Sequence, residues 1–265
     1  MPSDDHYWSA TKHPWACVLF VLPLLAIYEI GLYTFGHVAP EELRNGADVW
    51  LRSALGEVGI SPIYGAPCLL VFVLLLWGLF CRENRPLDQT GVWVGMSAES
   101  AAFALVLFAL SQGVWMLLLR ADNVLGRPTQ RIALLSFAAG SPESTWSQII
   151  SYLGAGIYEE TLFRLLLFAG LLRLFSWSKL HSSSGTPEAE RAWYNTALAA
   201  FASALVFAGA HHLGVNGEPF NLYVFSFRCF AGIYFAWLYH LRGFGIAVGA
   251  HAGYDVLVGL IVQPA

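Results

Sequence analysis

The 265-residue chain is 57% apolar, 15% aromatic and only 12% charged. Soluble domains are roughly one quarter charged, so this chain has too few charges to cover a surface that faces water. The net charge of −4 argues against the clustered basic face that nucleic-acid binding requires. The four cysteines, Cys17, Cys68, Cys81 and Cys229, are far apart and show no C-x-x-C spacing, so neither a disulfide framework nor a thiolate zinc site is expected.

Long apolar runs predict transmembrane helices, since about 20 helical residues cross a hydrocarbon layer of about 30 Å. Residues 63–81 and 101–119 contain no charge, and residues 14–35 contain only Glu29. We interpret residues 14–35 as a retained first span, because a cleaved signal peptide is shorter and ends in small residues before its cleavage site.

Further apolar runs in the second half are interrupted by polar residues. They cover residues 146–172, 196–211, 222–241 and 243–262, and the run 132–140 is too short to span a membrane alone. The runs form blocks rather than the alternating pattern of a β-barrel, and a backbone in lipid must satisfy its own hydrogen bonds. The sequence therefore predicts an all-α, polytopic transmembrane bundle of seven or eight helices.

Two polar connections carry a structural signal. In residues 41–58 the apolar positions recur at helical spacing, which predicts a helix lying at the membrane interface. The charged residues expected on its water-facing side are Glu41, Arg44, Asp48 and Arg52. Residues 181–191 are rich in Ser, Gly, Pro and charge, which is typical of a loop between two halves. Lys and Arg occur in nearly every loop, so the positive-inside rule does not fix the orientation.

Ionisable residues inside the apolar runs mark where function is expected. Such residues are costly in a membrane helix and usually face the bundle interior or a water-filled cavity. They form three groups in separate predicted helices: Glu159, Glu160 and Arg164 in YEETLFR, His211 and His212 in FAGAHH, and His251 and Asp255 in HAGYD.

The first group is sorted by helix geometry. At about 100° per residue, Glu160 and Arg164 are nearly stacked, which predicts an ion pair between them. Glu159 points about 100° away from Glu160 and is left free for chemistry. A carboxylate in an apolar surround becomes a stronger proton acceptor, as a general base requires. The alternative interpretation is a set of interfacial charges at a helix end.

The second group contains a histidine that neighbours an aromatic ring. Phe207 precedes His211 by four residues, so its ring is expected beside the imidazole. His211 and His212 point in different directions, unlike the two histidines of an H-E-x-x-H zinc site. Four histidines are interpreted as interfacial residues without a chemical role: His37, His181, His212 and His240.

The third group repeats the four-residue spacing. Asp255 can accept a hydrogen bond from His251 and fix its tautomer, or, when protonated, donate one to a developing oxyanion. The alternative is a buried polar pair that joins two helices. Together the groups supply the parts of a hydrolase that adds water to a carbonyl without a covalent intermediate. Ser151, Ser203 and Ser226 lie in no G-x-S-x-G turn, so an acyl-enzyme is not favoured.

The chain resembles the CAAX protease and bacteriocin-processing family (CPBP, or Abi) of intramembrane proteases in three ordered motifs: E-E-x-x-x-R at Glu159, Glu160 and Arg164, F-x-x-x-H at Phe207 and His211, and H-x-x-x-D at His251 and Asp255. The resemblance covers residues 146–262 and implies a glutamate-dependent endopeptidase. In that family the residues that match Glu159 and His211 activate water. Those that match His251 and Asp255 form the oxyanion site. The last position is often Asn, so Asp255 must be protonated or act indirectly.

The resemblance divides the chain into N-terminal membrane helices without a motif, residues 1–140, and a CPBP-like core, residues 141–265. It implies a protein or peptide substrate with a membrane-embedded or lipidated terminus, the lipid bilayer as surroundings and no nucleic acid. We expect a multi-pass protein of the cell (inner) membrane that needs no cofactor. In the alternative, zinc is bound by Glu159 or Glu160 with His211 and His251.

A different class of function remains as the alternative: an inactive membrane scaffold or receptor, or a transporter. Its polar path would contain Glu29, Glu159, Arg228 and His251. Glu29 and Arg228 fit no catalytic motif, and we hypothesise that they pair inside the bundle. A transporter is expected to have broken helices in two similar halves, whereas this chain has one half with motifs and one without.

Overall fold

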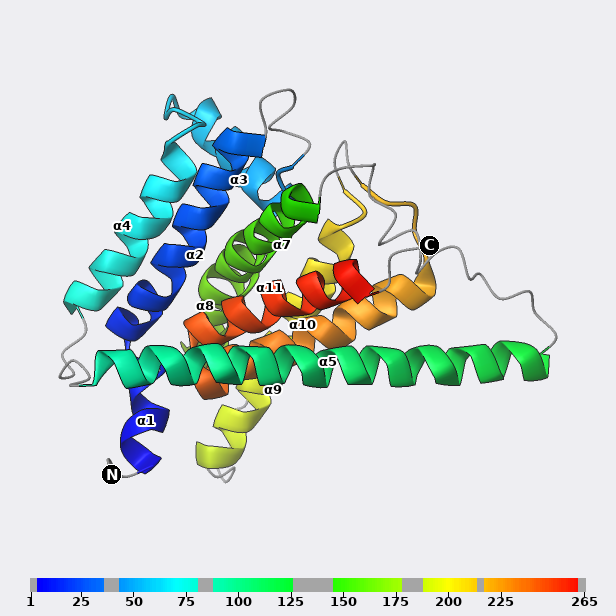
Figure 1. The fold of residues 1–265 in the computed structure, drawn as a ribbon. Coiled ribbons are helices and arrows are strands. Elements are labelled where there is room, and N and C mark those ends of the chain that lie inside the picture. The colour runs from blue at the N-terminus through cyan, green and yellow to red at the C-terminus, as the bar shows by residue number, and fades with distance from the viewer. Residues whose placement is uncertain are drawn as a thin grey trace.

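The computed structural model describes residues 4–35, 43–80, 88–125, 145–177, 188–213 and 217–261. Within these ranges every regular element is a helix, as predicted (Figure 1). The elements are α1 (Asp4–Ala10), α2 (Pro14–Phe35), α3 (Gly46–Glu57), α4 (Gly65–Phe80), α5 (Gln89–Leu125), α7 (Thr145–Glu160), η1 (Thr161–Phe168), α8 (Ala169–Trp177), α9 (Glu188–Ala210), α10 (Leu222–Arg242) and α11 (Phe244–Ile261).

Four of the described helices are long and apolar enough to cross a membrane. They are α2, α9, α10 and the Gln89–Val114 part of α5, while α4 and most of α11 are shorter apolar helices. Large apolar side chains, among them Ile30, Phe72 and Leu105, are exposed on the surface of this bundle. Lipid is the natural neighbour of such a surface. The prediction of an all-α membrane bundle is confirmed.

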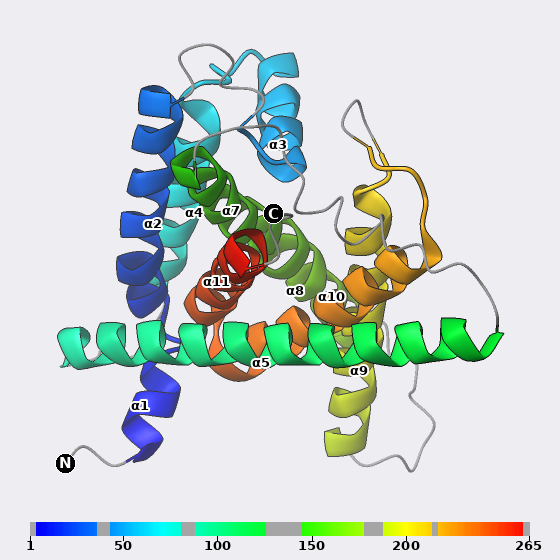
Figure 2. The ribbon, with the colours of Figure 1, turned by 45° about the vertical axis from the view of Figure 1, so that its right-hand side comes forward.

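Helix α11 lies in the centre of the bundle and packs against α2, α5, α7 and α10 (Figure 2). Its residues Phe244, Ile246 and Val248 are fully buried. Because α2 and α5 come from the first half of the chain and α7 and α10 from the second, both halves contribute to one hydrophobic core. The predicted division into residues 1–140 and 141–265 rests on where the motifs lie in the sequence, and it stays a prediction.

Helix α5 is longer than the span predicted at residues 101–119. It begins at Gln89 and continues for 37 residues, which is about 55 Å at the rise of an α-helix. The charge on Glu99 set the limit of the predicted run. In the structure the Arg242 guanidinium donates to both Glu99 carboxylate oxygens, at 2.9–3.0 Å, so the helix accommodates this charge.

Two glycines allow helices of the bundle to approach closely. A methyl group at Gly156 of α7 would lie 2.8 Å from the Val248 carbonyl oxygen and from the Ala252 nitrogen of α11. A methyl group at Gly232 of α10 would lie 2.9 Å from Ala204 Cα of α9. Small residues at such contacts let membrane helices pack backbone to backbone. The polar residues of α7, α9 and α11 are thereby brought together.

The orientation predicted for helix 41–58 is wrong. Helix α3 starts after Asn45, whose side chain accepts a hydrogen bond from the Asp48 amide at 2.8 Å. Asp48 and Arg52, expected to face water, are buried at 0% and 5% exposure, because polar groups of α2 and α7 pair with them. Helical spacing separates two faces of a helix but does not reveal that a polar neighbour covers the charged one. Glu41 lies outside the described residues.

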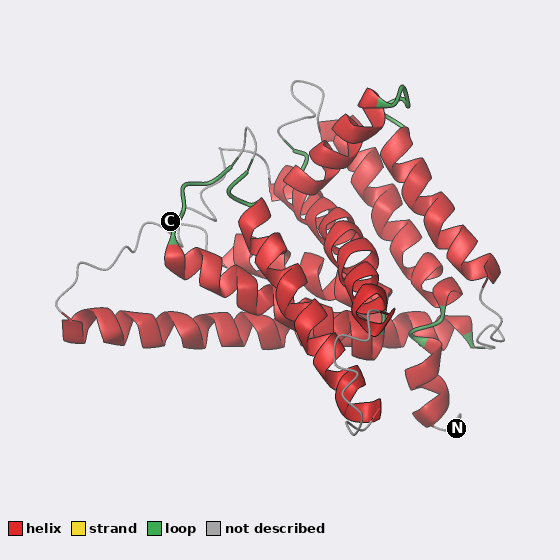
Figure 3. Ribbon diagram, turned by 180° about the vertical axis from the view of Figure 1, so that it is seen from behind, coloured by secondary structure: helices red, strands yellow, loops and turns green. Residues whose placement is uncertain are grey.

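The loop predicted at residues 181–191 is partly helical, since α9 already begins at Glu188 (Figure 3). Glu188 and Glu190 lie in its first turn, where carboxylates interact favourably with the helix dipole. Residues 181–187, with His181, lie outside the described residues, as do His37 and the short run 132–140.

The close contact at Gly156 allows the packing of α7 against α11 to be tested. We expect Gly156→Ala to lower the stability of the protein by about 1–3 kcal/mol, because the added methyl group meets backbone atoms of α11. Gly209→Ala in α9 is the matched control, since nothing lies within 4 Å of its added methyl group. Thermal unfolding in detergent measures both variants. Equal stability of the two variants would contradict the packing described.

Candidate active site

The three motif groups meet at one cavity of about 240 Å³ between α7, α9, α10 and α11. Glu159 and Glu160 end α7, His211 directly follows α9, and His251 and Asp255 lie on α11. The ionisable side chains that line the cavity are Glu159, His211, Glu218, Arg228, His251 and Asp255. Aromatic rings, including Phe207 and Phe235, form much of the remaining wall.

The carboxylate of Glu159 faces two imidazoles. Its Oε2 lies 3.8 Å from His211 Nε2 and 3.7 Å from His251 Nε2, and the residue is 8% exposed. Both distances are too long for good direct hydrogen bonds. They have the length of polar contacts that a single water molecule can bridge. The structure thus brings Glu159, His211 and His251 together, as the spacing of the motifs predicted.

The ring of His211 is held by Phe207 in two ways. Its Nδ1 lies 2.8 Å from the Phe207 carbonyl oxygen, and the two rings meet edge to face with centroids 4.9 Å apart. A carbonyl only accepts hydrogen bonds, so Nδ1 carries the proton. In its neutral form the imidazole therefore presents an unprotonated Nε2 to Glu159. The predicted proximity of the Phe207 ring is confirmed.

The ring of His251 is fixed by Glu160 and Phe235. Its Nδ1 lies 2.7 Å from Glu160 Oε1, and its ring stacks on that of Phe235 with centroids 4.5 Å apart. Its Nε2 faces Asp255 Oδ2 at 3.5 Å as well as Glu159. Sequence reasoning gave Asp255 the role of fixing the His251 tautomer as one option. In the structure Glu160 makes the shorter bond, a contact between α7 and α11 that spacing within one helix does not reveal.

Glu160 also forms the predicted ion pair with Arg164. Arg164 Nε lies 3.3 Å from Glu160 Oε2, and both residues are almost fully buried. The guanidinium lies 4.4 Å from the ring centre of Phe207 and 5.5 Å from that of Phe235. Rings at these distances attract a cation through their π faces. Arg164 therefore connects α7 with the two aromatic residues that also hold His211 and His251.

The helix through YEETLFR is not a regular α-helix. Thr161–Phe168 form a π-helix, in which the Ala169 amide donates to the Arg164 carbonyl five residues earlier. The Thr161 hydroxyl donates to the Ile157 carbonyl at 2.7 Å, the acceptor that its own amide would take in an α-helix. Such segments are frequent at functional sites. The 100° spacing used above holds as far as Glu160 and fails beyond it.

The cavity also contains Glu218, which the sequence analysis did not single out, and Arg228 has a different partner from the one predicted. Arg228 Nη2 donates to Glu218 Oε1 at 2.8 Å, and both residues line the cavity. The predicted pair between Arg228 and Glu29 is wrong, because Glu29 on α2 accepts from Arg52 on α3 instead. Glu218 lies in the connection between α9 and α10, and its only signal in the sequence was that it closely follows the His211 motif.

Two of the four histidines interpreted as interfacial, His212 and His240, lie in the described residues, and neither lines the cavity. His212 Nδ1 lies 2.9 Å from the Glu218 carbonyl oxygen, and its ring packs against Phe220. His240 packs against Phe168 and Trp237. Among the residues that the structure describes, no group of three or more His, Cys, Asp or Glu residues is arranged to hold a metal ion.

Residues 141–257 match the sequence model of the family described as type II CAAX prenyl endopeptidase Rce1-like. The matched region contains all the motif residues: Glu159, Glu160, Arg164, Phe207, His211, His251 and Asp255. Residues 141–257 therefore form an Rce1-like domain. Comparisons with curated proteins and with solved structures gave no significant match.

The Rce1-like family consists of CAAX-type proteases, so the chain is an enzyme of the peptide-hydrolase class. Its resemblance to the CAAX protease and bacteriocin-processing family is confirmed. The four membrane-capable helices and the Rce1-like domain together identify an integral membrane protein.

Proposed function

We propose that the chain is an intramembrane endopeptidase that hydrolyses a peptide bond near a membrane-anchored or lipidated terminus of its substrate. We place it in the cell membrane. One observation carries the proposal: a buried carboxylate faces the Nε2 atoms of two histidines at 3.7 and 3.8 Å, within a cavity. A carboxylate base and an imidazole are the groups that activate water for attack on a carbonyl.

In the proposed reaction, a water molecule lies between Glu159 and His211. Its oxygen attacks the scissile carbonyl carbon while one of its protons passes to the Glu159 carboxylate. The unprotonated Nε2 of His211 accepts the second hydrogen of the water in a hydrogen bond, because Nδ1 is engaged by the Phe207 carbonyl. Glu159 then gives its proton to the leaving amine nitrogen, which restores the carboxylate when the C–N bond breaks.

His251 is proposed to stabilise the oxyanion that forms on the scissile carbonyl oxygen. When protonated, its imidazolium presents Nε2–H to the cavity, and the Glu160 carboxylate bonded to Nδ1 balances the positive charge. The stack on Phe235 fixes the plane of the ring before the reaction starts. Asp255, 3.5 Å from Nε2, acts through His251 by orienting this N–H. Preorganised donors of this kind contribute about 3–4 kcal/mol to an oxyanion.

The cavity wall indicates the chemistry of the substrate. Val224, Phe227 and Ala231 of α10 give it an apolar side that suits a hydrophobic segment. Arg228, 7% exposed, lies on the same helix and is paired with Glu218, whose side chain is 42% exposed. Glu218 can turn toward water, and a carboxylate that enters the cavity then replaces it as the partner of the buried Arg228 guanidinium. We infer that Arg228 then binds the free C-terminal carboxylate of a peptide that is cut close to this end.

The roles of Glu159 and His211 are tested with a farnesylated, internally quenched peptide that carries a free C-terminus. We expect Glu159→Gln and His211→Asn each to lower kcat by about 10²–10⁴, the usual contribution of a general base and its helper. His240→Asn is the matched control, because His240 packs against Phe168 and Trp237 and does not line the cavity. Cleavage by Glu159→Gln at the rate of the parent would remove the proposed mechanism.

The role of Arg228 is tested by comparing this peptide with its C-terminal amide. We expect Arg228→Gln to raise KM for the peptide with a free C-terminus about ten- to hundredfold, because one charge-assisted hydrogen bond is lost. KM for the C-terminal amide should stay nearly unchanged. Glu218→Gln should lower KM for the acid, because the neutral side chain competes less for Arg228. If Arg228→Gln affects acid and amide alike, the residue does not recognise the carboxylate.

We expect cleavage to proceed without a metal ion. The alternative zinc set uses Glu159 or Glu160, and Glu160 is already engaged by Arg164 and His251. Among the described residues, no group of three or more His, Cys, Asp or Glu residues is arranged to hold a metal ion. Incubation with a strong chelator should therefore leave the rate of peptide cleavage unchanged. Loss of cleavage that added zinc restores would establish the metal-dependent alternative instead.

A further inference from the structure

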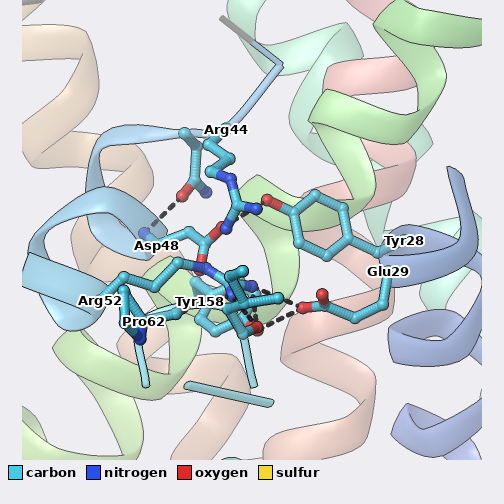
Figure 4. A network of polar contacts seen from close by, with 9 residues as sticks. Tyr28, Glu29, Arg44, Asp48, Arg52, Pro62 and Tyr158 are labelled. Carbon is cyan, nitrogen blue, oxygen red and sulfur yellow. Dashed lines mark hydrogen bonds and ion pairs between the residues drawn. The ribbon is translucent and has the colours of Figure 1, made fainter. Parts of the chain in front are cut away.

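A second buried polar cluster lies on the side of α7 that faces α2 and α3 (Figure 4). It consists of Tyr28, Glu29, Asp48, Arg52 and Tyr158, and we call it the α2–α3 cluster. Four of its members precede residue 141, so they lie outside the region that matches the Rce1-like family. Neither the hydrolytic step nor the substrate-binding residues described above use any of the five.

Arg52 is the centre of the α2–α3 cluster. Its Nε donates to Asp48 Oδ1 at 2.6 Å, its Nη2 to Glu29 Oε1 at 2.8 Å, and its Nη1 to the Pro62 carbonyl at 2.8 Å. Arg44 Nη1 lies 3.5 Å from Asp48 Oδ2. Two carboxylates and two guanidinium groups thus face one another. Groups buried in this way are strongly held, because removing one partner leaves an uncompensated charge.

Tyr158 links the α2–α3 cluster to the candidate active site. Its hydroxyl donates to Glu29 Oε1 at 2.8 Å, and the residue is fully buried. It directly precedes Glu159, and consecutive side chains of a helix diverge by about 100°. Tyr158 therefore faces α2 and α3 while Glu159 faces the cavity. The Tyr158–Glu29 hydrogen bond on one side of α7 therefore holds the same helical turn that carries the Glu159 carboxylate on the other side.

We propose that the Arg52–Glu29–Tyr158 chain of hydrogen bonds fixes the rotation of α7 about its own axis and thereby orients the Glu159 carboxylate in the cavity. This inference rests on the proposed function of Glu159. The α-helix ends at Glu160, where the π-helix begins, so regular helical bonding does not continue past the two carboxylates. On the side of α7 that faces α11, Glu160 is held by its hydrogen bond to His251. On the opposite side, Tyr158 is held by its hydrogen bond to Glu29.

The size of the effect follows from helix geometry. The side chains of a helix extend about 5–6 Å from its axis, so a rotation of about 10° moves a carboxylate by about 1 Å. A misplacement of about 1 Å can lower the rate of an enzyme about a hundredfold. If Tyr158 has this positioning role, its loss should lower kcat and leave KM nearly unchanged, because substrate binding does not depend on the orientation of the Glu159 carboxylate.

Tyr28 provides a matched control within the same cluster. Its hydroxyl donates to Asp48 Oδ2 at 2.8 Å, and like Tyr158 it is fully buried. Tyr28→Phe and Tyr158→Phe therefore each remove one buried hydroxyl that is bonded to a carboxylate, at a similar cost in stability. Tyr28 belongs to α2, however, and only Tyr158 is on the helix that carries Glu159.

The experiment compares both variants with the parent by thermal unfolding and by steady-state cleavage of the farnesylated peptide. We expect similar unfolding temperatures, a kcat lowered about tenfold or more in Tyr158→Phe with little change in KM, and a nearly unchanged kcat in Tyr28→Phe. Glu29→Gln, which keeps an acceptor oxygen for Tyr158, should retain more of kcat than Glu29→Leu. Equal kcat values for the two tyrosine variants would overturn the proposal.

A second measurement needs no substrate and so separates this inference from the proposed function. ¹⁵N-labelled histidine spectra of the protein in detergent report the Glu160–His251 hydrogen bond, with His251→Asn used to assign the signals. We expect Tyr158→Phe to shift the His251 ring nitrogens and Tyr28→Phe to leave them in place. If neither variant or both variants shift them, the α2–α3 cluster does not position α7, whichever peptide the enzyme cleaves.

Discussion

The hydrogen bond between Glu160 and His251 is the interaction on which the rest of the site depends. Two consecutive carboxylates inside an apolar bundle repel each other and lose their hydration, which is costly unless each finds a partner. His251 hydrogen-bonds Glu160 Oε1, and the Arg164 guanidinium lies 3.3 Å from Glu160 Oε2. Glu159 is then left facing the cavity, where its carboxylate faces the two Nε2 atoms. The same bond ties α7 to α11 and so fixes the distance between the two motifs.

The packing around this bond explains why it forms. Gly156 lets α7 approach α11 closely, four residues before Glu160. Phe207 and Phe235 from α9 and α10 then enclose the Arg164 guanidinium, and the same two rings hold His211 and His251. Four helices therefore share one set of aromatic contacts. The α2–α3 cluster adds the N-terminal helices to this arrangement, although they carry no motif of the Rce1-like family.

Much of the fold and the membership of the site were predictable, since apolar runs and four-residue spacing are local properties. Residues 14–35 are helix α2 with the same bounds, and each of the three motifs contributes at least one residue to the wall of one cavity. Contacts between distant segments were not predictable. Glu29 was predicted to pair with Arg228, and nothing in the sequence revealed that Arg52 of α3 rather than Arg228 of α10 lies beside it. The π-helix after Glu160 is a local departure from α-helical hydrogen bonding, which composition does not show.

The central claim is that a carboxylate and an imidazole from separate helices hold a single reactive water molecule. An experimental density map of the protein in lipid, at a resolution that shows ordered water, tests it most directly. The account predicts a water peak about 2.8 Å from both Glu159 Oε2 and His211 Nε2, the distance of an ordinary hydrogen bond. A map in which Glu159 bonds directly to a protein side chain, or in which a metal ion lies between these atoms, would contradict it.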